Sequence, residues 1–174
     1  TPLDPRVLDA MLPYFQQDFG NPSSIHRHGQ KAEAAIEAAR DRIAECLVCQ
    51  ADEVVFTSCG SESDNLALRG AAIAARQTRN ANHILISPVE HHAVSHTAEQ
   101  LAVIYGFEVE YLPVDVYGKV NPDDVKRRLR PDTAIVSVIY ANNEIGTINP
   151  IKDIASICHA GQIPFHTDAV QAGT

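Results

Sequence analysis

Polar side chains that could bind a ligand or move protons gather in four short stretches, each of which follows an apolar run. The stretches span residues 58–61, 88–92, 141–146 and 167–171. They hold Gly60-Ser61, the imidazoles of His91-His92, the carboxamides of Asn142-Asn143 beside Glu144, and Asp168 with Gln171. Hydroxyl and amide donors, an imidazole and a carboxylate together suit an anionic ligand on which protons must be moved.

The first stretch has the pattern of an anion-binding loop. Residues 54–65 (VVFTSCGSESDN) read as a strand, a tight loop and the start of a helix. Unpaired backbone N–H groups and the positive end of the helix dipole meet at such a point and stabilise a phosphate. Gly60 lets the backbone approach closely, and Ser61 adds a hydroxyl donor. A second interpretation is that Ser61 only caps the helix, with Glu62 and Asp64 as first-turn acids.

One ligand spanning all four stretches would meet a particular set of groups. Its phosphate would lie at Gly60-Ser61, and it would then meet an imidazole, two carboxamides and a carboxylate that follows a buried strand. A carboxylate in that position can keep a heteroaromatic nitrogen protonated, and an imidazole can lie flat on a ring while it moves protons. Pyridoxal 5'-phosphate requires such a set, and it is the cofactor that the residues predict.

The elements between these stretches alternate in type. Apolar periodicity predicts helices over 5–17, 30–47, 61–79, 94–105 and 151–160, and another that begins near Asn121-Pro122. Apolar runs predict strands over 54–57, 83–87, 107–114, 133–140 and 163–166. The alternation predicts an α/β fold: a mostly parallel sheet with helices on both faces. Ligands of such sheets lie beyond the carboxyl ends of the strands, where the four polar stretches fall.

Composition excludes several classes of protein. A 45% hydrophobic and 21% charged chain of 174 residues with net charge −8 is that of an ordinary globular domain without an extended cationic surface for nucleic acid. No apolar run approaches the roughly 20 residues of a membrane span, so a soluble, cytoplasmic protein is expected. Cys46 and Cys49 lack a second cysteine pair, and His92 and His96 lack an evident third ligand, so no metal site is predicted.

Four motifs in order along the chain resemble those of the cysteine desulfurases, a branch of the class V aminotransferases, and most closely the branch associated with nitrogen fixation. They are TSCGSESDN (57–65), VEHHAV (89–94), ANNEIGT (141–147) and HTDAVQA (166–172), preceded by GNPSS at 20–24. The resemblance covers essentially the whole chain. It implies the large cofactor-binding domain of fold-type I pyridoxal-phosphate enzymes in truncated form.

The resemblance also implies a role for each site residue. Gly60 and Ser61 would bind the cofactor phosphate. His91 would stack on the pyridine ring and assist proton transfer. Asp168 would pair with the ring nitrogen, Gln171 would donate to the phenolic oxygen, and Asn143 would lie beside that oxygen and the substrate carboxylate.

In the family's reaction, L-cysteine becomes L-alanine and its sulfur passes to an enzyme persulfide for iron–sulfur cluster assembly. The resemblance therefore implies a homodimer and a sulfur-acceptor or scaffold protein as partners. The family's Schiff-base lysine and sulfur-accepting cysteine belong to segments beyond Gln171, so the chain is expected to be an inactive part of a longer enzyme. We expect an N-terminal helix and loop segment over 1–30 and a partial cofactor domain over 31–174.

Three other functions stay open from the sequence. A selenocysteine lyase, or another pyridoxal-phosphate enzyme with the same fold, would share these motifs. A nucleotide-binding α/β domain could use the Gly60-Ser61 loop, although no G-x-G-x-x-G follows the first predicted strand. A catalytically silent chain could serve only as an interaction surface.

Overall fold

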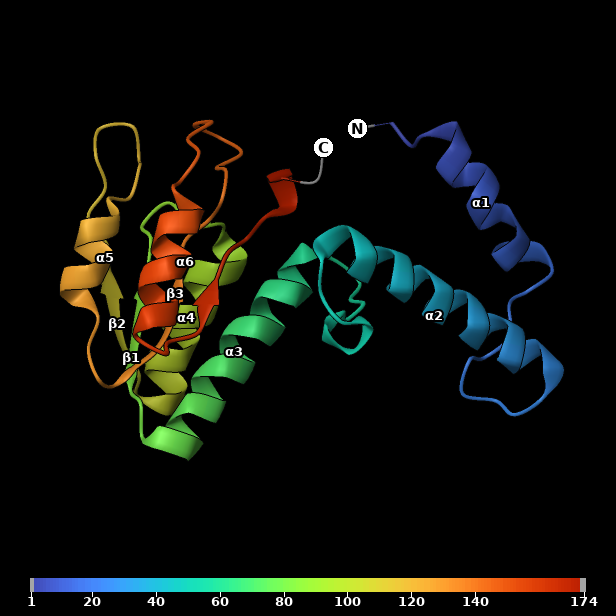
Figure 1. Cartoon of the computed structure of the whole chain (residues 1–174), viewed down its shortest axis with the longest axis horizontal. Helices are drawn as coiled ribbons and strands as arrows, with labels where there is room; N and C mark the ends of the chain where they lie inside the picture. Colours follow the sequence, from blue (N-terminus) through green and yellow to red (C-terminus); the bar gives the residue numbers. More distant parts are fainter. Residues whose placement is uncertain (1, 173–174) are drawn as a thin grey trace. The chain divides into compact units, whose positions relative to one another are not determined.

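The computed structural model describes residues 2–172, and the chain divides into two compact units between Phe56 and Thr57 (Figure 1). The first unit contains α1 (Pro5–Gln16), α2 (Arg27–Leu47) and the 3-10 helix η1 (Ala51–Glu53). The predicted division into 1–30 and 31–174 stays a prediction.

The two α-helices of the first unit begin at residues whose side chains cap them. Asp4 accepts a hydrogen bond from Arg6 N at 2.8 Å, and Pro5 stands where a missing N–H does no harm. His26 Nδ1 accepts from Gly29 N at 3.2 Å, so α2 begins at Arg27, three residues before its predicted start. Both predicted helices are therefore present.

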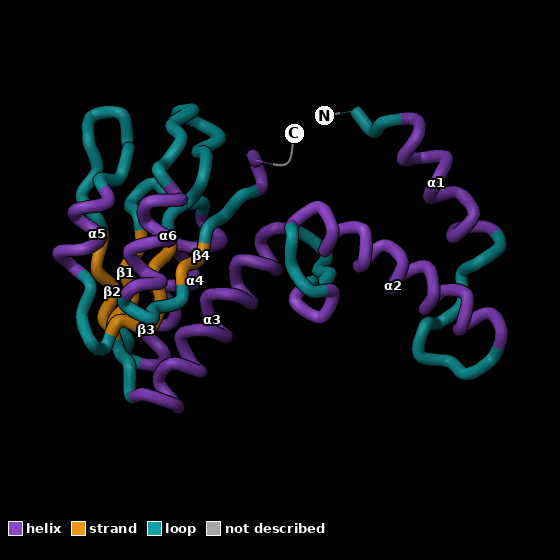
Figure 2. The backbone as a smooth tube through the Cα atoms, in the orientation of Figure 1, coloured by secondary structure: helices purple, strands orange, loops and turns teal. Residues whose placement is uncertain are grey.

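The second unit alternates helices with strands, as Figure 2 shows by colour. Its elements are α3 (Gly60–Arg79), β1 (His83–Ile86), α4 (His92–Tyr105), β2 (Glu108–Tyr111), α5 (Pro122–Arg128), β3 (Thr133–Ser137), α6 (Ile151–Ala160), β4 (Phe165–His166) and the 3-10 helix η2 (Val170–Ala172). Every predicted helix of this unit is confirmed.

The four strands form one parallel sheet in the order β2-β1-β3-β4. β1 and β3 occupy the middle, and every residue in them is buried. Strands buried on both faces need side chains that are almost all apolar, which explains the Ile84-Leu85-Ile86 run.

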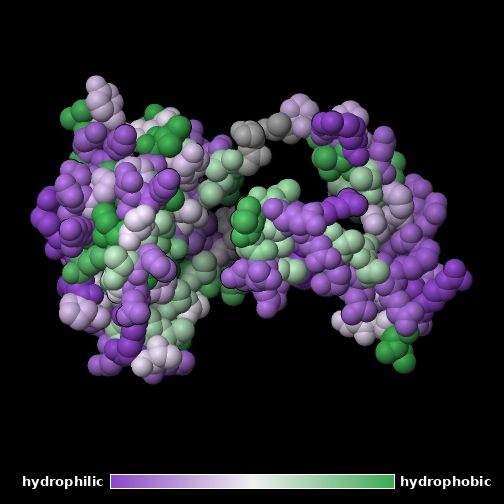
Figure 3. Space-filling view, viewed as in Figure 1, coloured by the Kyte–Doolittle hydropathy of each residue, from purple (hydrophilic) through white to green (hydrophobic). Residues whose placement is uncertain are grey.

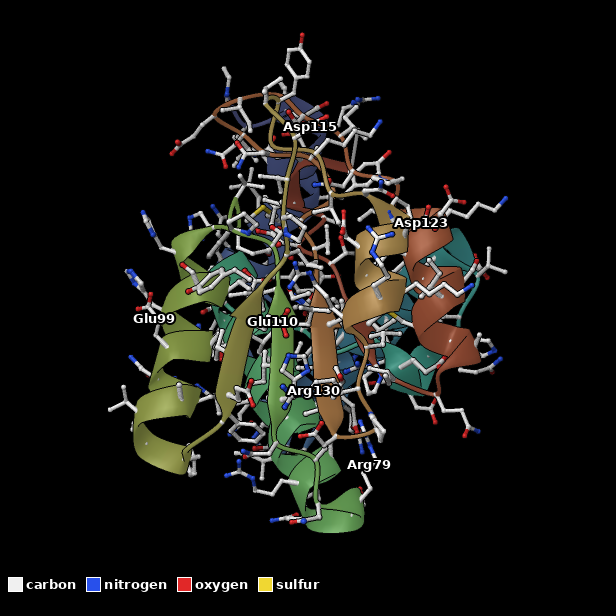
Figure 4. The ribbon with its side chains drawn as sticks, turned by 90° about the vertical axis from the view of Figure 1, so that its left-hand side faces the viewer. Arg79, Glu99, Glu110, Asp115, Asp123 and Arg130 are labelled. Carbon is white, nitrogen blue, oxygen red and sulfur yellow. The ribbon has the colours of Figure 1, made fainter. Side chains whose placement is uncertain are left out.

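Helices cover both faces of this sheet, because alternate strand residues point to opposite sides. Ile84 and Ile86 pack in a cluster with apolar residues of α3 and α4. Leu85 belongs to a second cluster, which includes Val125 of α5 and Ile154 of α6. Figure 4 shows the sheet with α4 on one side and α5 on the other. The predicted fold class is confirmed.

One predicted strand is wrong and the other four are too long. Residues 54–57 have no regular secondary structure, because an apolar run becomes a strand only when another strand pairs with it, and none of the described strands does. The predicted strands 83–87, 107–114, 133–140 and 163–166 are longer than the observed β1, β2, β3 and β4. β1 pairs with β2 only as far as Tyr111, and β3 pairs with only the two residues of β4.

Figure 3 shows hydrophilic and hydrophobic side chains interspersed on the visible face of the molecule. Within residues 2–172, no helix combines the length and the apolar character that crossing a membrane requires.

Candidate functional site

A cavity of about 260 Å³ opens at the carboxyl-end edge of the sheet, beside the N-terminus of α3. All six site residues predicted from the sequence line it, together with four others. The lining residues are Cys59, Gly60, Ser61, Asp64, His91, Ile139, Asn143, Asp168, Val170 and Gln171. Side chains that lie up to about a hundred positions apart in the sequence therefore share one space, as the parallel sheet predicts. The role of each stays a prediction.

The N-terminus of α3 presents free backbone donors to this cavity. Its N-cap residue is Cys59, and the helix ladder begins with Ser63 N donating to Cys59 O at 3.2 Å. The amides of Gly60, Ser61 and Glu62 therefore lie outside the ladder. Because Ser61 is the second residue of the helix, the interpretation of Ser61 as the capping residue is wrong.

Gly60 is required by a close approach within the cavity wall. A Cβ atom built on Gly60 would lie 2.9 Å from Cγ2 of Val170, well inside van der Waals contact. Val170 belongs to η2, which follows Asp168 directly in the chain. Because Gly60 has no side chain, the start of α3 and the segment after β4 can lie together in one wall of the cavity.

Asp168 is a buried carboxylate, 7% exposed, just beyond β4. Its Oδ1 accepts from Val170 N at 3.0 Å, and its carbonyl accepts from Tyr140 N at 2.9 Å. Backbone pairing with the segment after β3 therefore holds Asp168 at the edge of the sheet, with its second carboxylate oxygen left for another donor.

His91 and His92 differ sharply in their surroundings. His91 caps α4, where its Nδ1 accepts from Ala93 N at 3.1 Å, so the proton of the neutral ring lies on Nε2. His92 does not line the cavity; its ring stacks on that of His96, with centroids 4.9 Å apart. Within the described chain, no three His, Cys, Asp or Glu residues are grouped closely enough to bind a metal ion.

Asn142 and Asn143 also have different contacts. Asn142 Oδ1 accepts from Glu144 N and Ile145 N, and its Nδ2 donates to Val89 O at 2.8 Å. Asn142 therefore fixes its own loop and ties it to the loop that carries His91. Asn143, the predicted ligand-binding residue, lines the cavity.

Sequence reasoning missed the place of Asp64 in the cavity wall. Asp64 is 5% exposed, and its Oδ1 lies 3.4 Å from Nε2 of His166. The interpretation of Asp64 as a first-turn acid overlooked a signal in the spacing. Residues three apart share a helix face, so Asp64 lies on the side of α3 that carries Ser61.

The comparisons with known proteins agree on a family. The family model for aminotransferase class-V matches residues 1–174. Cysteine desulfurase IscS of Methanosarcina thermophila is 51% identical over 172 residues, which are 99% of this chain and 42% of that protein. Cysteine desulfurase IscS of Dictyoglomus turgidum is 49% identical over 171 residues, 98% of this chain and 43% of that protein.

Solved structures give the same result. A protein described as NifS-like superposes with a TM-score of 0.90 at 36% identity, over 98% of this chain and 47% of that one. SspA in complex with cysteine gives 0.88 at 38% identity, over 96% and 47%. The chain belongs to the class-V aminotransferase family. Its curated relatives are cysteine desulfurases, which are pyridoxal-phosphate enzymes, and it spans less than half of their length.

The donor set of the cavity fits pyridoxal phosphate. Amides and a hydroxyl at the start of α3 suit a phosphate, and the spare oxygen of Asp168 suits a protonated ring nitrogen. No lysine is among the lining residues. The lysines of the sequence are Lys31, Lys119, Lys126 and Lys152.

The thiols of Cys59 and Cys158 should differ in reactivity. The Glu62 backbone amide and the Ser58 hydroxyl stabilise the thiolate of Cys59 and hold its pKa below the ordinary value, and this residue is exposed. Burial raises the pKa of Cys158 to about 11. At neutral pH, iodoacetamide should modify Cys59 at least about tenfold faster than Cys158, because only the thiolate reacts. Peptide mapping by mass spectrometry measures both rates. Equal labelling of the two residues in the folded protein would contradict the described environments.

Proposed function

We propose that this chain holds the cofactor of a cysteine desulfurase, an enzyme that converts L-cysteine to L-alanine and passes the sulfur to an enzyme cysteine. The observation that carries the proposal is the meeting of all six predicted residues in one cavity. The kinship with cysteine desulfurases over nearly the whole chain gives the substrate class.

In this proposal, the α3 N-terminus and Ser61 bind the phosphate, since the amides of Gly60 and Ser61 are free of the helix ladder. The carboxylate of Asp168 would accept a hydrogen bond from the protonated pyridine nitrogen. Pyridoxal phosphate, when bound, withdraws electrons from the amino acid. Asp168 sustains that withdrawal by keeping the nitrogen protonated.

The remaining residues orient the ring and move protons. The imidazole of His91 lies against the ring, with its Nε2 proton available for transfer because Nδ1 is engaged by Ala93 N. Gln171 donates to the phenolic oxygen. Asn143 lies beside that oxygen and the substrate carboxylate.

The active enzyme would also need a lysine for the Schiff base and a cysteine to accept the sulfur, neither of which is among the residues proposed here to bind the cofactor. None of the four lysines lines the cavity, so residues 1–174 alone should be inactive. The other proposed features are a homodimer, a cytoplasmic location, and a sulfur-acceptor or scaffold protein of iron–sulfur assembly as partner. They rest on kinship with the desulfurases alone.

Replacing Ser61 tests the phosphate site. Ser61→Ala removes one hydrogen bond to a dianionic group, so the affinity for pyridoxal phosphate should fall about tenfold or more, measured by equilibrium dialysis. Ser63→Ala is the matched control. It lies in the same helical turn, but its hydroxyl meets Thr57 Oγ1 at 2.6 Å and does not line the cavity. If both variants bind the cofactor as the wild type does, the phosphate lies elsewhere.

Replacing Asp168 tests the partner of the ring nitrogen. In the full-length protein, Asp168→Asn should lower kcat for alanine formation by about 100-fold or more, because a neutral amide cannot hold the nitrogen protonated. The asparagine Oδ1 can still accept a hydrogen bond from Val170 N. The free energy of unfolding, measured in urea, should therefore change by less than about 1 kcal/mol. Exposed Asp41→Asn is the control. Undiminished turnover in a correctly loaded D168N protein would refute the assignment.

The missing lysine gives a third test. Residues 1–174 treated with pyridoxal phosphate and borohydride should release all bound cofactor on denaturation, whereas the full-length protein should keep it covalently attached. Mass spectrometry reads the adduct. A single stoichiometric adduct on one of the four lysines of residues 1–174 would contradict the proposal.

A further inference from the structure

Glu90 is a partly buried carboxyl group that the proposed function does not use. It lies in the loop between β1 and α4, directly before the cavity residue His91. Its Oε1 accepts from Ser87 Oγ and from Ile139 N, both at 2.6 Å. Through these contacts Glu90 ties the loop of His91 to the carboxyl ends of β1 and β3.

The second oxygen of Glu90 begins a row of polar groups that crosses the sheet. Glu90 Oε2 lies 3.4 Å from Ser137 Oγ, which lies 2.8 Å from Nδ1 of His166. His166 Nε2 lies 3.4 Å from Oδ1 of Asp64, which lines the cavity. The row therefore connects two walls of the cavity from beneath.

This row has one proton too few for all of its hydrogen bonds. The carboxylate of Asp64 favours the imidazole proton on Nε2 of His166, which leaves Nδ1 as an acceptor. Ser137 then has a single hydroxyl proton for two acceptors, Nδ1 and Glu90 Oε2. One added proton completes the row in either of two ways. It can lie on Oε2, which donates to Ser137 while Ser137 donates to Nδ1, or on Nδ1, with both bonds reversed.

We propose that Glu90, Ser137 and His166 share one exchangeable proton beneath the cavity, and that Glu90 uses it as a positioning residue for the loop that carries His91. With the proton, Glu90 and His166 together are neutral. Without it, they add a negative charge beside the carboxylates of Asp64 and Asp168, and the row loses a hydrogen bond. The proton passes between Oε2 and Nδ1 through Ser137 Oγ, which gives up one proton as it receives another.

The electrostatic surroundings of Glu90 support this assignment. Burial raises the pKa of Glu90 to about 7, against the opposing effect of the hydrogen bonds from Ser87 and Ile139. His166 lowers it and Asp168 raises it, each by a smaller amount. Glu90 therefore keeps its proton well above the pH at which an exposed glutamate loses it.

The protonated state has a permanent mimic. In Glu90→Gln, the amide oxygen can accept from Ser87 and Ile139 while the amide N–H donates to Ser137. The variant should thus keep the row complete at every pH. Exposed Glu99→Gln on the following helix, labelled in Figure 4, is the matched control. Ser137→Ala breaks the row without touching the bonds to Oε1.

Stability as a function of pH tests the proton without any cofactor. An unfolded glutamate releases its proton near 4.5 and the folded one near 7, so between these values the folded state holds more protons. The free energy of unfolding therefore falls as pH rises through this window. The unfolding constant of the wild type relative to E90Q should rise roughly 100-fold from about pH 5 to about pH 8. The unfolding constant of the wild type relative to E99Q should not rise in this way, because both proteins keep Glu90.

Infrared titration locates the proton. The wild type and E99Q should show a carboxylic-acid band that disappears near neutral pH, and E90Q should lack it. In S137A, the pH at which the band disappears should change, because Glu90 Oε2 loses its contact with Ser137 Oγ. If E90Q keeps the band, or if Glu90 titrates near 4.5 in the wild type, the shared proton does not exist. The wild-type titration decides the matter even if a variant fails to fold.

The consequence for His91 rests on the proposed function, so its test is separate. The affinity of the wild type for pyridoxal phosphate should fall as pH rises through about 7, whereas that of E90Q should fall several-fold less. An identical fall in both proteins would overturn the positioning role. A protein that binds no pyridoxal phosphate at any pH would instead overturn the proposed function and leave the infrared result standing.

Discussion

Parallel pairing of β1, β3 and β4 is the constraint on which the rest of this structure depends. It forces three separate segments to end at the same edge of the sheet, with Ser137 opposite His166 in register. The strands are apolar because helices cover both of their faces, so their register is held by the core and not by the polar loops. The loops can then carry chemistry without having to stabilise the fold.

The core does not pass directly into the cavity. Between them lies a thin polar layer, in which Ser87, Ser137 and His166 follow the apolar residues Ile86, Val136 and Phe165. Buried polar groups are costly unless each finds a partner, and these find one another and Glu90. A satisfied layer of this kind is stiff, and it supports the ligand-facing residues from below much as packing supports a buried side chain.

Features that depend on residues close together in the sequence could be predicted, whereas those that depend on distant residues could not. Helices were predictable because capping and periodicity are local, as at Asn121, whose side chain accepts from Asp123 N. The run at 54–57 is apolar enough for a strand, yet strand formation depends on a partner that local sequence does not contain. The six cavity residues could be named because motif order and sheet topology bring them together. Glu90 and Asp64 escaped notice because their partners lie 47 and 102 positions away, at Ser137 and His166.

The contact between Gly60 and Val170 has a consequence for how this site can change over time. Val170 is β-branched and its χ1 is restricted, so a methyl group at position 60 would force a shift of this side chain or of the backbone. An alanine at position 60 would become acceptable only after, or together with, a smaller residue at position 170. The two positions thus form a size-complementary couple, and mutational paths that alter one first should pass through a less fit intermediate.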